Sequence, residues 1–374
     1  MHIELLSKCN ELENHHDTFK PRSNLQRFSV SHLSSSLRSH CTCGVDTHAH
    51  VVPFEFPSFL GSAAPSGWPS MAHMDDCHRQ VIIDGKNYRT VSDKCWSTSR
   101  RLADFEDMGL ALQAISPMPE LLSYWLKPVD AAALIRYIND QIAAMVLESS
   151  GKFIGMGAVP LQDIDLAIKE LEYLRRTPGF AGVEIGSNIN GVAIGDLRFA
   201  PFFEACEALD MAVFVHALRP TGMDRLIGPP LLQQVLAYPT DVGLAAASVL
   251  TSNLILRHPR LRMAFSHGGG TLAMLLPRLE QAISVFPALR ESVQQSPTEQ
   301  ARQFFYDTLV FDEPTLRHLV HCFGDTQLMI GTDYPFNFHD DQPVARLEAA
   351  SLTPEALERM TQSNASRFLG LPLA

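Results

Sequence analysis

The stretch Val45-Asp46-Thr47-His48-Ala49-His50 places two histidines two positions apart, where a short apolar run is expected to end a strand. Side chains at positions i and i+2 of a strand point to the same face, so both imidazoles can converge on one metal ion. Chance is the plainer explanation, because a chain with 15 histidines will contain such a pair somewhere. Whether the pair binds a metal therefore depends on further ligands elsewhere in the chain.

Segments typical of strands and of helices alternate from this stretch to the C-terminus. We expect strands at residues 45–49, 112–116, 153–159, 182–185, 212–216, 261–266, near 304–308 and at 327–331. We expect helices at residues 98–108, 130–147, 163–176, 198–209, 229–253, 271–286, 313–322 and 354–368. In the segment 130–147 the apolar side chains recur every three or four positions, as in a helix with one buried face. Strands alternating with helices indicate a parallel sheet, and eight such units predict an α/β fold, a (β/α)₈ TIM-like barrel.

The polar residues of the chain fit this barrel, because such folds carry their chemistry at the C-terminal ends of the strands. His48 and His50 follow the first expected strand, His216 the fifth, His267 the sixth and Asp333 the eighth. Each residue alone has a plainer interpretation as a core, capping or turn residue. Their shared position at strand ends favours one common site.

Composition limits the classes of partner. The formal net charge of -11 and the pI near 5.7 argue against nucleic acids and anionic membranes, because both require clustered Lys and Arg. No apolar run approaches the roughly 18 residues of a membrane-spanning helix, so we expect a small-molecule partner and no membrane. Seven widely spread cysteines indicate reduced thiols in a cytoplasmic protein. Cys41-Thr42-Cys43 beside His40 lacks the second pair that a metal cluster would need.

The sequence suggests a short N-terminal extension and one large domain. Its 374 residues suit either two ordinary domains or one large barrel. Residues 1–42 are rich in Ser, His, Asn and charge and show no sustained periodicity, so we expect a flexible extension there, or a start codon placed too far upstream. The barrel domain is expected at residues 43–374. It includes an insertion at residues 52–96, rich in Pro, Gly, Trp and Ser, that is too irregular to form one element.

Four motifs at the strand ends resemble those of a known family. They are D-x-H-x-H at residues 46–50, F-V-H at 214–216, F-S-H-G-G-G at 265–270 and G-T-D-Y-P-F at 331–336. Together they resemble the amidohydrolase superfamily, and within it the branch of non-oxidative decarboxylases that act on 2-amino-3-carboxymuconate-6-semialdehyde and related acids. The likeness extends over residues 44–372 and includes the segments 85–89, 95–96, 122–128, 159–162 and 363–370.

The resemblance implies a metal centre. It assigns one Zn²⁺ to the side chains of His48, His50, His216 and Asp333, a ligand set that suits this ion and leaves a position open for water. Many amidohydrolases hold a second metal through a carboxylated lysine on the fourth strand. That strand has no lysine here, so a single ion is expected. Glu184 stands where the family has an amide, and it could add charge near the site or, less favoured, act as a ligand.

The resemblance also assigns the proton transfer. It places His267 beside the metal without making it a ligand, and an imidazole that titrates near neutral pH is suited to taking and returning a proton. Asp333 would share this catalytic role.

Cations are expected to recognise the substrate, because it carries carboxylates. Arg89 matches a carboxylate-binding arginine of the family, and Arg257 matches one that the family delivers into the neighbouring subunit's site, which implies a homodimer. The alternative for both residues is a surface ion pair. Trp125 and Phe336 are candidates for the pocket wall, although such aromatic residues are more often simple core.

One departure concerns the substrate. The family usually has Pro-Trp after the histidine corresponding to His216, whereas this chain has Ala217-Leu218-Arg219-Pro220. We expect a smaller apolar wall with a charge at the rim of the pocket. The leading hypothesis is a zinc-dependent decarboxylase of an aminocarboxymuconate-semialdehyde-like unsaturated acid, working without an organic cofactor. The alternatives are a decarboxylase of hydroxybenzoates, a metal-dependent hydrolase of lactones, amides or esters, and a non-enzymatic metal-binding scaffold.

Overall fold

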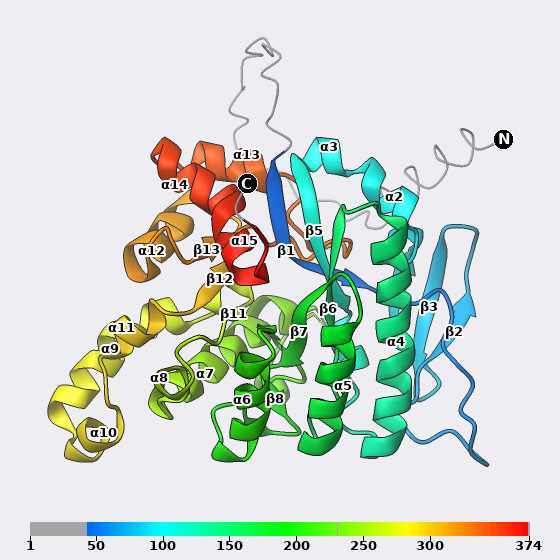
Figure 1. Ribbon diagram of the computed structural model, residues 1–374, viewed down its shortest axis with the longest axis horizontal. Coiled ribbons are helices and arrows are strands. Elements are labelled where there is room, and N and C mark those ends of the chain that lie inside the picture. The colour runs from blue at the N-terminus through cyan, green and yellow to red at the C-terminus, as the bar shows by residue number, and fades with distance from the viewer. Residues whose placement is uncertain (1–42, 230, 373–374) are drawn as a thin grey trace, which may run out of the picture.

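The computed structural model describes residues 43–229 and 231–372, so the extension expected at residues 1–42 lies outside the described residues. In the described part, eight parallel strands form one sheet, with a strand at each predicted position (Figure 1). In sheet order these are β1 (Gly44–Val51), β5 (Leu110–Pro117), β6 (Phe153–Gly157), β7 (Phe180–Gly186), β10 (Ala212–His216), β11 (Met263–Phe265), β12 (Phe305–Asp307) and β13 (Leu328–Met329).

Hydrogen bonds bring the last strand back to the first. The amide of Thr47 donates to the carbonyl of Ile330 at 2.9 Å, and the carbonyl of His48 accepts from the amide of Asp333 at 2.8 Å. A parallel bridge pairs Ala49 with Tyr334 just beyond. These contacts close the sheet, and the predicted (β/α)₈ barrel is confirmed.

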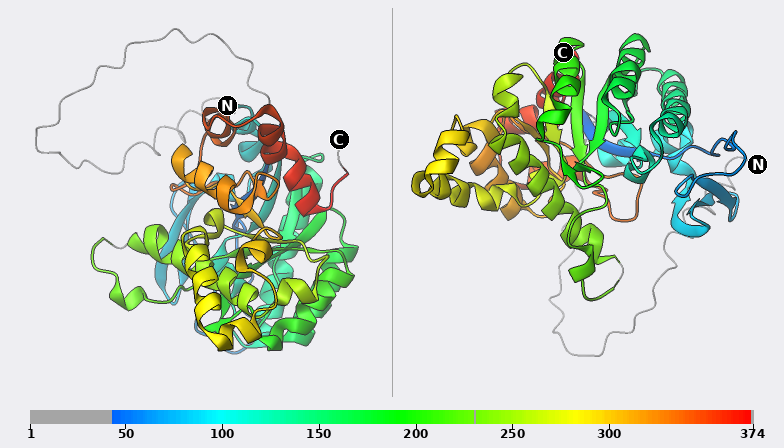
Figure 2. Two further views of the ribbon diagram at one scale, coloured as in Figure 1. Left: turned by 90° about the vertical axis from the view of Figure 1, so that its left-hand side faces the viewer. Right: turned by 90° about the horizontal axis from the view of Figure 1, so that it is seen from below.

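Helices lie around the outside of the barrel (Figures 1 and 2). They are α2 (Thr98–Ala103), α3 (Phe105–Met108), α4 (Pro128–Glu148), α5 (Ile164–Arg176), α6 (Ala200–Ala208), α7 (Tyr238–Thr251), α8 (Leu254–Arg257), α9 (Leu272–Val285), α10 (Pro287–Ser292), α11 (Pro297–Ala301), α12 (Glu313–Phe323), α13 (Pro343–Ala349), α14 (Pro354–Glu358) and α15 (Asn364–Leu369). The longest, α4, buries the stripe Leu134, Ile138 and Ile142, each 0% exposed, as its periodicity predicts.

Three predicted helices are interrupted. The helix expected at 98–108 breaks at Asp104 into α2 and α3, and the one expected at 354–368 contains a π-helical turn, Arg359–Ser363. The helix expected from residue 229 begins as α7 only at Tyr238, after a π-helical turn over Gln233–Ala237. Pro239 lies in the first turn of α7, where its missing N–H costs no hydrogen bond.

The insertion contains a regular element that its composition concealed. A three-stranded antiparallel sheet comprises β2 (Ser70–His73), β3 (His78–Ile83) and β4 (Lys86–Ser92). Asp84 and Gly85 connect β3 to β4 with φ of 53° and 71°, the left-handed pair of a tight hairpin. The insertion is therefore not one element, as expected, but part of it is a regular sheet, and the hairpin fixes the position of Arg89 on β4.

The barrel interior explains why the site forms at one end. Phe214 fills the interior together with Phe305, and Phe368 of α15 packs against both rings. His216 lies two residues beyond Phe214 on β10 and so points to the same interior face, one layer higher. His48 rests on Phe214, with 5.0 Å between the ring centroids. The apolar layer thus supports a polar layer at the C-terminal ends of the strands.

The structure bears on the predictions for the cysteines and for membrane-spanning helices. Cys95, Cys206 and Cys322 are free thiols. Cys43 and Cys77 take part in disulfide bonds, so the expectation of reduced cysteines is wrong for these two residues. None of the helices in residues 43–229 and 231–372 combines the length and the apolar character needed to cross a bilayer.

Candidate metal centre and active-site cavity

Four residues meet at the C-terminal ends of β1 and β10 and in the segment that follows β13. One side-chain ligand atom from each of His48, His50, His216 and Asp333 lies within 4.8 Å of the other three. The Nε2 atoms of His48 and His50 are 3.1 Å apart, and Oδ1 of Asp333 is 3.0 Å from Nε2 of His50 and 3.6 Å from Nε2 of His48. The structure therefore brings together the four residues that were expected to bind one metal ion.

The hydrogen bonds behind two of the rings fix their tautomers. Nδ1 of His50 lies 3.1 Å from the carbonyl of Pro117, and Nδ1 of His216 lies 2.9 Å from the carbonyl of Ala217. Because a carbonyl oxygen can only accept, each Nδ1 carries the hydrogen and each Nε2 presents a lone pair. Nε2 of His216 is buried without a hydrogen-bond partner among the described residues.

A carboxylate fixes the tautomer of His48. Nδ1 of His48 donates to Oδ2 of Asp307 at 2.7 Å. The backbone amides of His267 and Gly268 donate to Asp307 at 2.9 and 2.8 Å, and that of Leu309 donates at 3.1 Å. Asp307 is therefore held rigidly and orients Nε2 of His48 toward the other ligands, as carboxylate partners of metal-binding histidines do.

The cluster has the electrostatics of a cation site. Burial lowers the pKa of His50 to about 4, although Asp333 opposes this shift. Burial alone would lower the pKa of His48, but the hydrogen bond to Asp307 and the charge of Asp333 raise it to about 9. The histidines around Asp333 outweigh its burial and hold its pKa well below the usual range. Three imidazoles and one ionised carboxylate thus surround a point where positive charge is favoured, and a divalent metal ion there would replace the proton on His48.

His267 lies beside this group without belonging to it. Its ring centroid is 5.4 Å from that of His48 and 5.1 Å from that of His216, and Oγ of Ser266 is 3.1 Å from its Nδ1. Burial and the neighbouring His48 lower its pKa. The following glycines allow close packing of the turn: a Cβ at Gly270 would lie 1.9 Å from the carbonyl oxygen of Pro239.

One cavity of about 280 Å³ connects the cluster to the exterior. Its lining includes His216, His267, Asp333, Arg89 and Phe336. The guanidinium carbon of Arg89 is 4.2 Å from the ring centroid of Phe336, and Phe336 stacks on His50 at 5.4 Å. Apolar and aromatic side chains complete the wall, among them Tyr88, Met118, Tyr238, Val310 and Phe338. The cavity thus combines a flat apolar wall, the positively charged guanidinium of Arg89 and part of the metal-ligand group.

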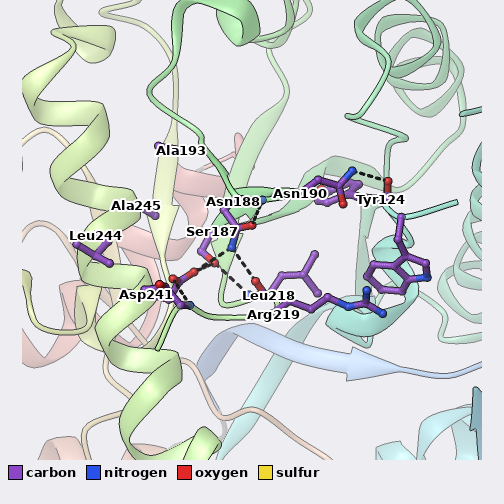
Figure 3. A pocket seen from close by; sticks show the side chains of 13 residues that line it. Tyr124, Ser187, Asn188, Asn190, Ala193, Leu218, Arg219, Asp241, Leu244 and Ala245 are labelled. Carbon is purple, nitrogen blue, oxygen red and sulfur yellow. Dashed lines mark hydrogen bonds between the residues drawn. The ribbon is translucent and has the colours of Figure 1, made fainter. Parts of the chain in front are cut away.

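Two other predicted site residues lie elsewhere. Arg257 is exposed on α8, where its guanidinium donates to the carbonyl of Ser252, and it does not line the cavity of its own chain. Trp125 lines a second, larger cavity of about 650 Å³, shown in Figure 3, which contains none of the four ligands. The structure therefore does not bring Arg257 and Trp125 to the site that this chain forms.

The residues after His216 also point away from the cluster. Leu218 and Arg219 line the second cavity (Figure 3). The guanidinium of Arg219 lies 3.2 Å above the ring of Trp125 and pairs with Glu120 at 2.7 Å. The charge of Arg219, which was expected at the rim of the active-site cavity, therefore lies in the second cavity instead.

Glu184 is buried behind the ligands rather than among them. Its Oε2 accepts from Oγ of Ser116 at 2.6 Å and lies 3.6 Å from Nδ1 of His50. Burial raises its pKa to about 8 despite the hydrogen bond from Ser116. The candidate ligand group of the described residues excludes it.

The residues that hold the candidate ligands in place were not predicted from the sequence. Asp46 accepts from Thr332 and from Gln113, and Arg101, fully buried, donates to the carbonyl of His50. Asp307 was also missed, although its place at the end of the seventh strand follows the same rule that identified the ligands. For Arg101 no signal was available, because contacts between distant segments carry no local pattern.

Comparisons with known proteins show the family to which the chain belongs. The profile of the amidohydrolase family matches residues 45–371, so the chain belongs to the amidohydrolase family. It is 34% identical to 2-amino-3-carboxymuconate-6-semialdehyde decarboxylase of Dictyostelium discoideum, over 87% of this chain and 91% of that protein. Its named relatives are decarboxylases, and the chain is a carboxy-lyase.

Solved structures share the fold. The apo form of Metarhizium anisopliae IDCase superimposes with a TM-score of 0.75 at 20% identity, covering 88% of this chain and 97% of that one. A dihydroxybenzoic acid decarboxylase from Polaromonas sp. JS666, solved with bound manganese, gives a TM-score of 0.67 at 21% identity and covers 74% of this chain and 86% of that one.

Proposed function

We propose that this protein is a zinc-dependent, non-oxidative decarboxylase of an unsaturated carboxylic acid similar to 2-amino-3-carboxymuconate semialdehyde. One observation carries the proposal: two of the four candidate ligands, His216 and Asp333, line a single small cavity together with His267 and Arg89, and the cavity has an aromatic wall. The 34% identity to the decarboxylase of Dictyostelium discoideum supports the same substrate class. Three imidazoles and one carboxylate are a set of ligands that Zn²⁺ favours, which supports zinc.

In the proposed reaction, the residues of the cavity bind and orient the acid. Arg89 holds a carboxylate through two parallel N–H donors, and Phe336 lies against the flat conjugated part of the substrate. The bond between carbon and the departing carboxylate breaks, its electron pair stays in the conjugated system, and CO₂ leaves. His267 gives a proton to that carbon and takes one back from water. A divalent cation held by His48, His50, His216 and Asp333 would supply a Lewis acid that stabilises the developing negative charge.

Arg89→Met is expected to raise KM for the carboxylate substrate by roughly 10- to 100-fold, the usual cost of losing hydrogen bonds to a charged group. Metal content should not change, because Arg89 is not a ligand. Steady-state kinetics and metal analysis measure both. Arg79→Met is the matched control, since Arg79 lies on the adjacent strand β3 over Phe54 and does not line the cavity. An unchanged KM in Arg89→Met would rule out this role.

A hydroxylated benzoate is the second candidate substrate. The flat wall of the cavity suits a planar aromatic acid equally well, and Ala217-Leu218 replaces the usual Pro-Trp after His216. The Polaromonas relative, a dihydroxybenzoic acid decarboxylase, supports this alternative. Comparing kcat/KM for the semialdehyde with kcat/KM for a panel of hydroxybenzoates, on the same zinc-loaded preparation, separates the two. A higher value for a benzoate would overturn the leading assignment.

We also propose a cytoplasmic homodimer in which Arg257 acts on the partner's site. The exposed position of Arg257, away from the cavity of its own chain, supports this arrangement. Exposed apolar side chains also support a dimer, because such side chains often lie in interfaces between subunits. Ile227 and Leu231 are 94% and 67% exposed on a segment that projects from the body, yellow-green in Figure 2.

Mixing two inactive variants tests the dimer. Arg257→Ala and His267→Asn each lack one half of the proposed shared site, so subunit exchange should create one complete site in every mixed dimer and restore activity. Kinetic assays before and after mixing, with sedimentation to measure mass, give the readout. A monomer, or mixed dimers that remain inactive although Arg257→Ala alone is inactive, would contradict the arrangement.

A further inference from the structure

Two of the ligand histidines have a carboxylate behind them. His48 has Asp307, 2.7 Å from its Nδ1, and His50 has Glu184, 3.6 Å from its Nδ1. In both cases the carboxylate lies on the side of the ring opposite to Nε2, the atom that faces the other ligands. A negative charge behind Nδ1 makes Nε2 a better electron donor to a cation.

Ser116 connects Glu184 to His50. Its Oγ is 2.6 Å from Oε2 of Glu184, 3.3 Å from Nδ1 of His50 and 3.2 Å from the carbonyl of Ala49. Ser116 therefore contacts the first strand at the ligand, and Glu184 on β7 fixes Ser116 on β5. The three neighbouring elements hold the ring of His50 at one angle.

In the described part of the chain, the second carboxylate oxygen of Glu184, Oε1, has no hydrogen bond like the one that Oε2 accepts from Ser116. Oε1 is buried and accepts no hydrogen bond from the described residues. A buried carboxylate oxygen without a donor costs free energy unless positive charge lies near. The other oxygen of the same carboxylate lies 3.6 Å from Nδ1 of His50, so a cation held by the ligand group would lie close to this charge. An amide at this position would carry no charge to balance the cation.

We infer that Glu184 is a positioning residue of the metal centre, which orients His50 through Ser116 and raises the affinity of the site for a divalent cation. This inference rests on the proposed metal site but not on the substrate. Glu184 touches neither the cation nor the substrate in this role. It acts through His50, as Asp307 acts through His48.

Glu184→Gln tests the charge, because the amide keeps the size of the side chain and can still accept from Ser116. We expect its affinity for Zn²⁺ to fall by about tenfold or more, the range found for lost partners of metal ligands. Titration against a chromogenic chelator measures the affinity, and thermal unfolding of the metal-free protein reports the fold. A purely structural role would lower the melting temperature and leave the affinity unchanged.

Two further variants complete the test. Ser116→Ala removes the connection but keeps the charge, so a smaller loss of affinity is expected. It also tests the inference if Glu184→Gln does not fold. Glu170→Gln is the control: this buried carboxylate binds Arg136 and Asn139 on α4, away from the site, so its affinity for Zn²⁺ should match the wild type.

The outcomes are distinguishable. A wild-type chain that binds no divalent cation defeats the proposed function itself. A wild-type chain that binds Zn²⁺ with the same affinity as Glu184→Gln, or as Ser116→Ala where only that variant folds, overturns the inference about Glu184 alone.

Discussion

Asp333→Asn is expected to lose the metal ion and the activity together. Asp333 is the only carboxylate among the four candidate ligands, and its oxygen lies 3.0 Å from Nε2 of His50. The amide retains the size of the side chain, and asparagine tolerates the left-handed backbone that Asp333 adopts, with φ of 63°. The loss of affinity should exceed about 100-fold, the upper range for partners that only support a ligand.

Metal analysis after dialysis and kinetic assay of the same sample measure this prediction. Asp340→Asn is the matched control, since Asp340 is buried in the same loop and binds Arg346 rather than the ligand group. Asp333→Asn that still holds one equivalent of metal would show that the carboxylate is not a ligand.

His267→Asn is expected to separate chemistry from metal binding. The ring of His267 lies beside those of His48 and His216 but offers no ligand atom to the group. Removing a proton donor of this kind lowers kcat by roughly 10² to 10⁴-fold. Asparagine can adopt the left-handed backbone of His267, with φ of 53°, so the turn should persist.

Metal content should remain that of the wild type in His267→Asn while kcat collapses. The exposed His321 on α12 provides the control His321→Asn, for which neither quantity should change. Loss of the metal in His267→Asn would instead identify His267 as a ligand.

Most of the barrel could be predicted because it follows from repeated local patterns in the sequence, and the strand ends of a barrel group the candidate ligands at one site. Alternating strands and helices limit the topology to few choices. The strand ends then bring His48, His50, His216 and Asp333 together, although 285 residues separate the first from the last. Their common place at the strand ends is visible in the sequence, whereas the irregular register of β1 between Asp46 and Ala49 and the left-handed backbone of Asp333 are not.

The rest depends on contacts that no local pattern encodes. The direction of Arg219 was not predictable, because its ion pair with Glu120 and its stacking on Trp125 join three separate segments. The role of Asp307 emerges only once the seventh strand lies next to His48. The antiparallel sheet of the insertion was missed for another reason: its Asp84-Gly85 turn was visible, but the surrounding Pro- and Gly-rich composition concealed it.

Release of CO₂ from 2-amino-3-carboxymuconate semialdehyde tests the central claim most directly. The measurement compares the zinc-loaded protein, the same protein stripped by a chelator, and the stripped protein after zinc is restored. Our account predicts CO₂ from the first and third samples and only the background from the second. Equal release from the stripped protein, or hydrolysis of a lactone without CO₂ from any carboxylate, would contradict it.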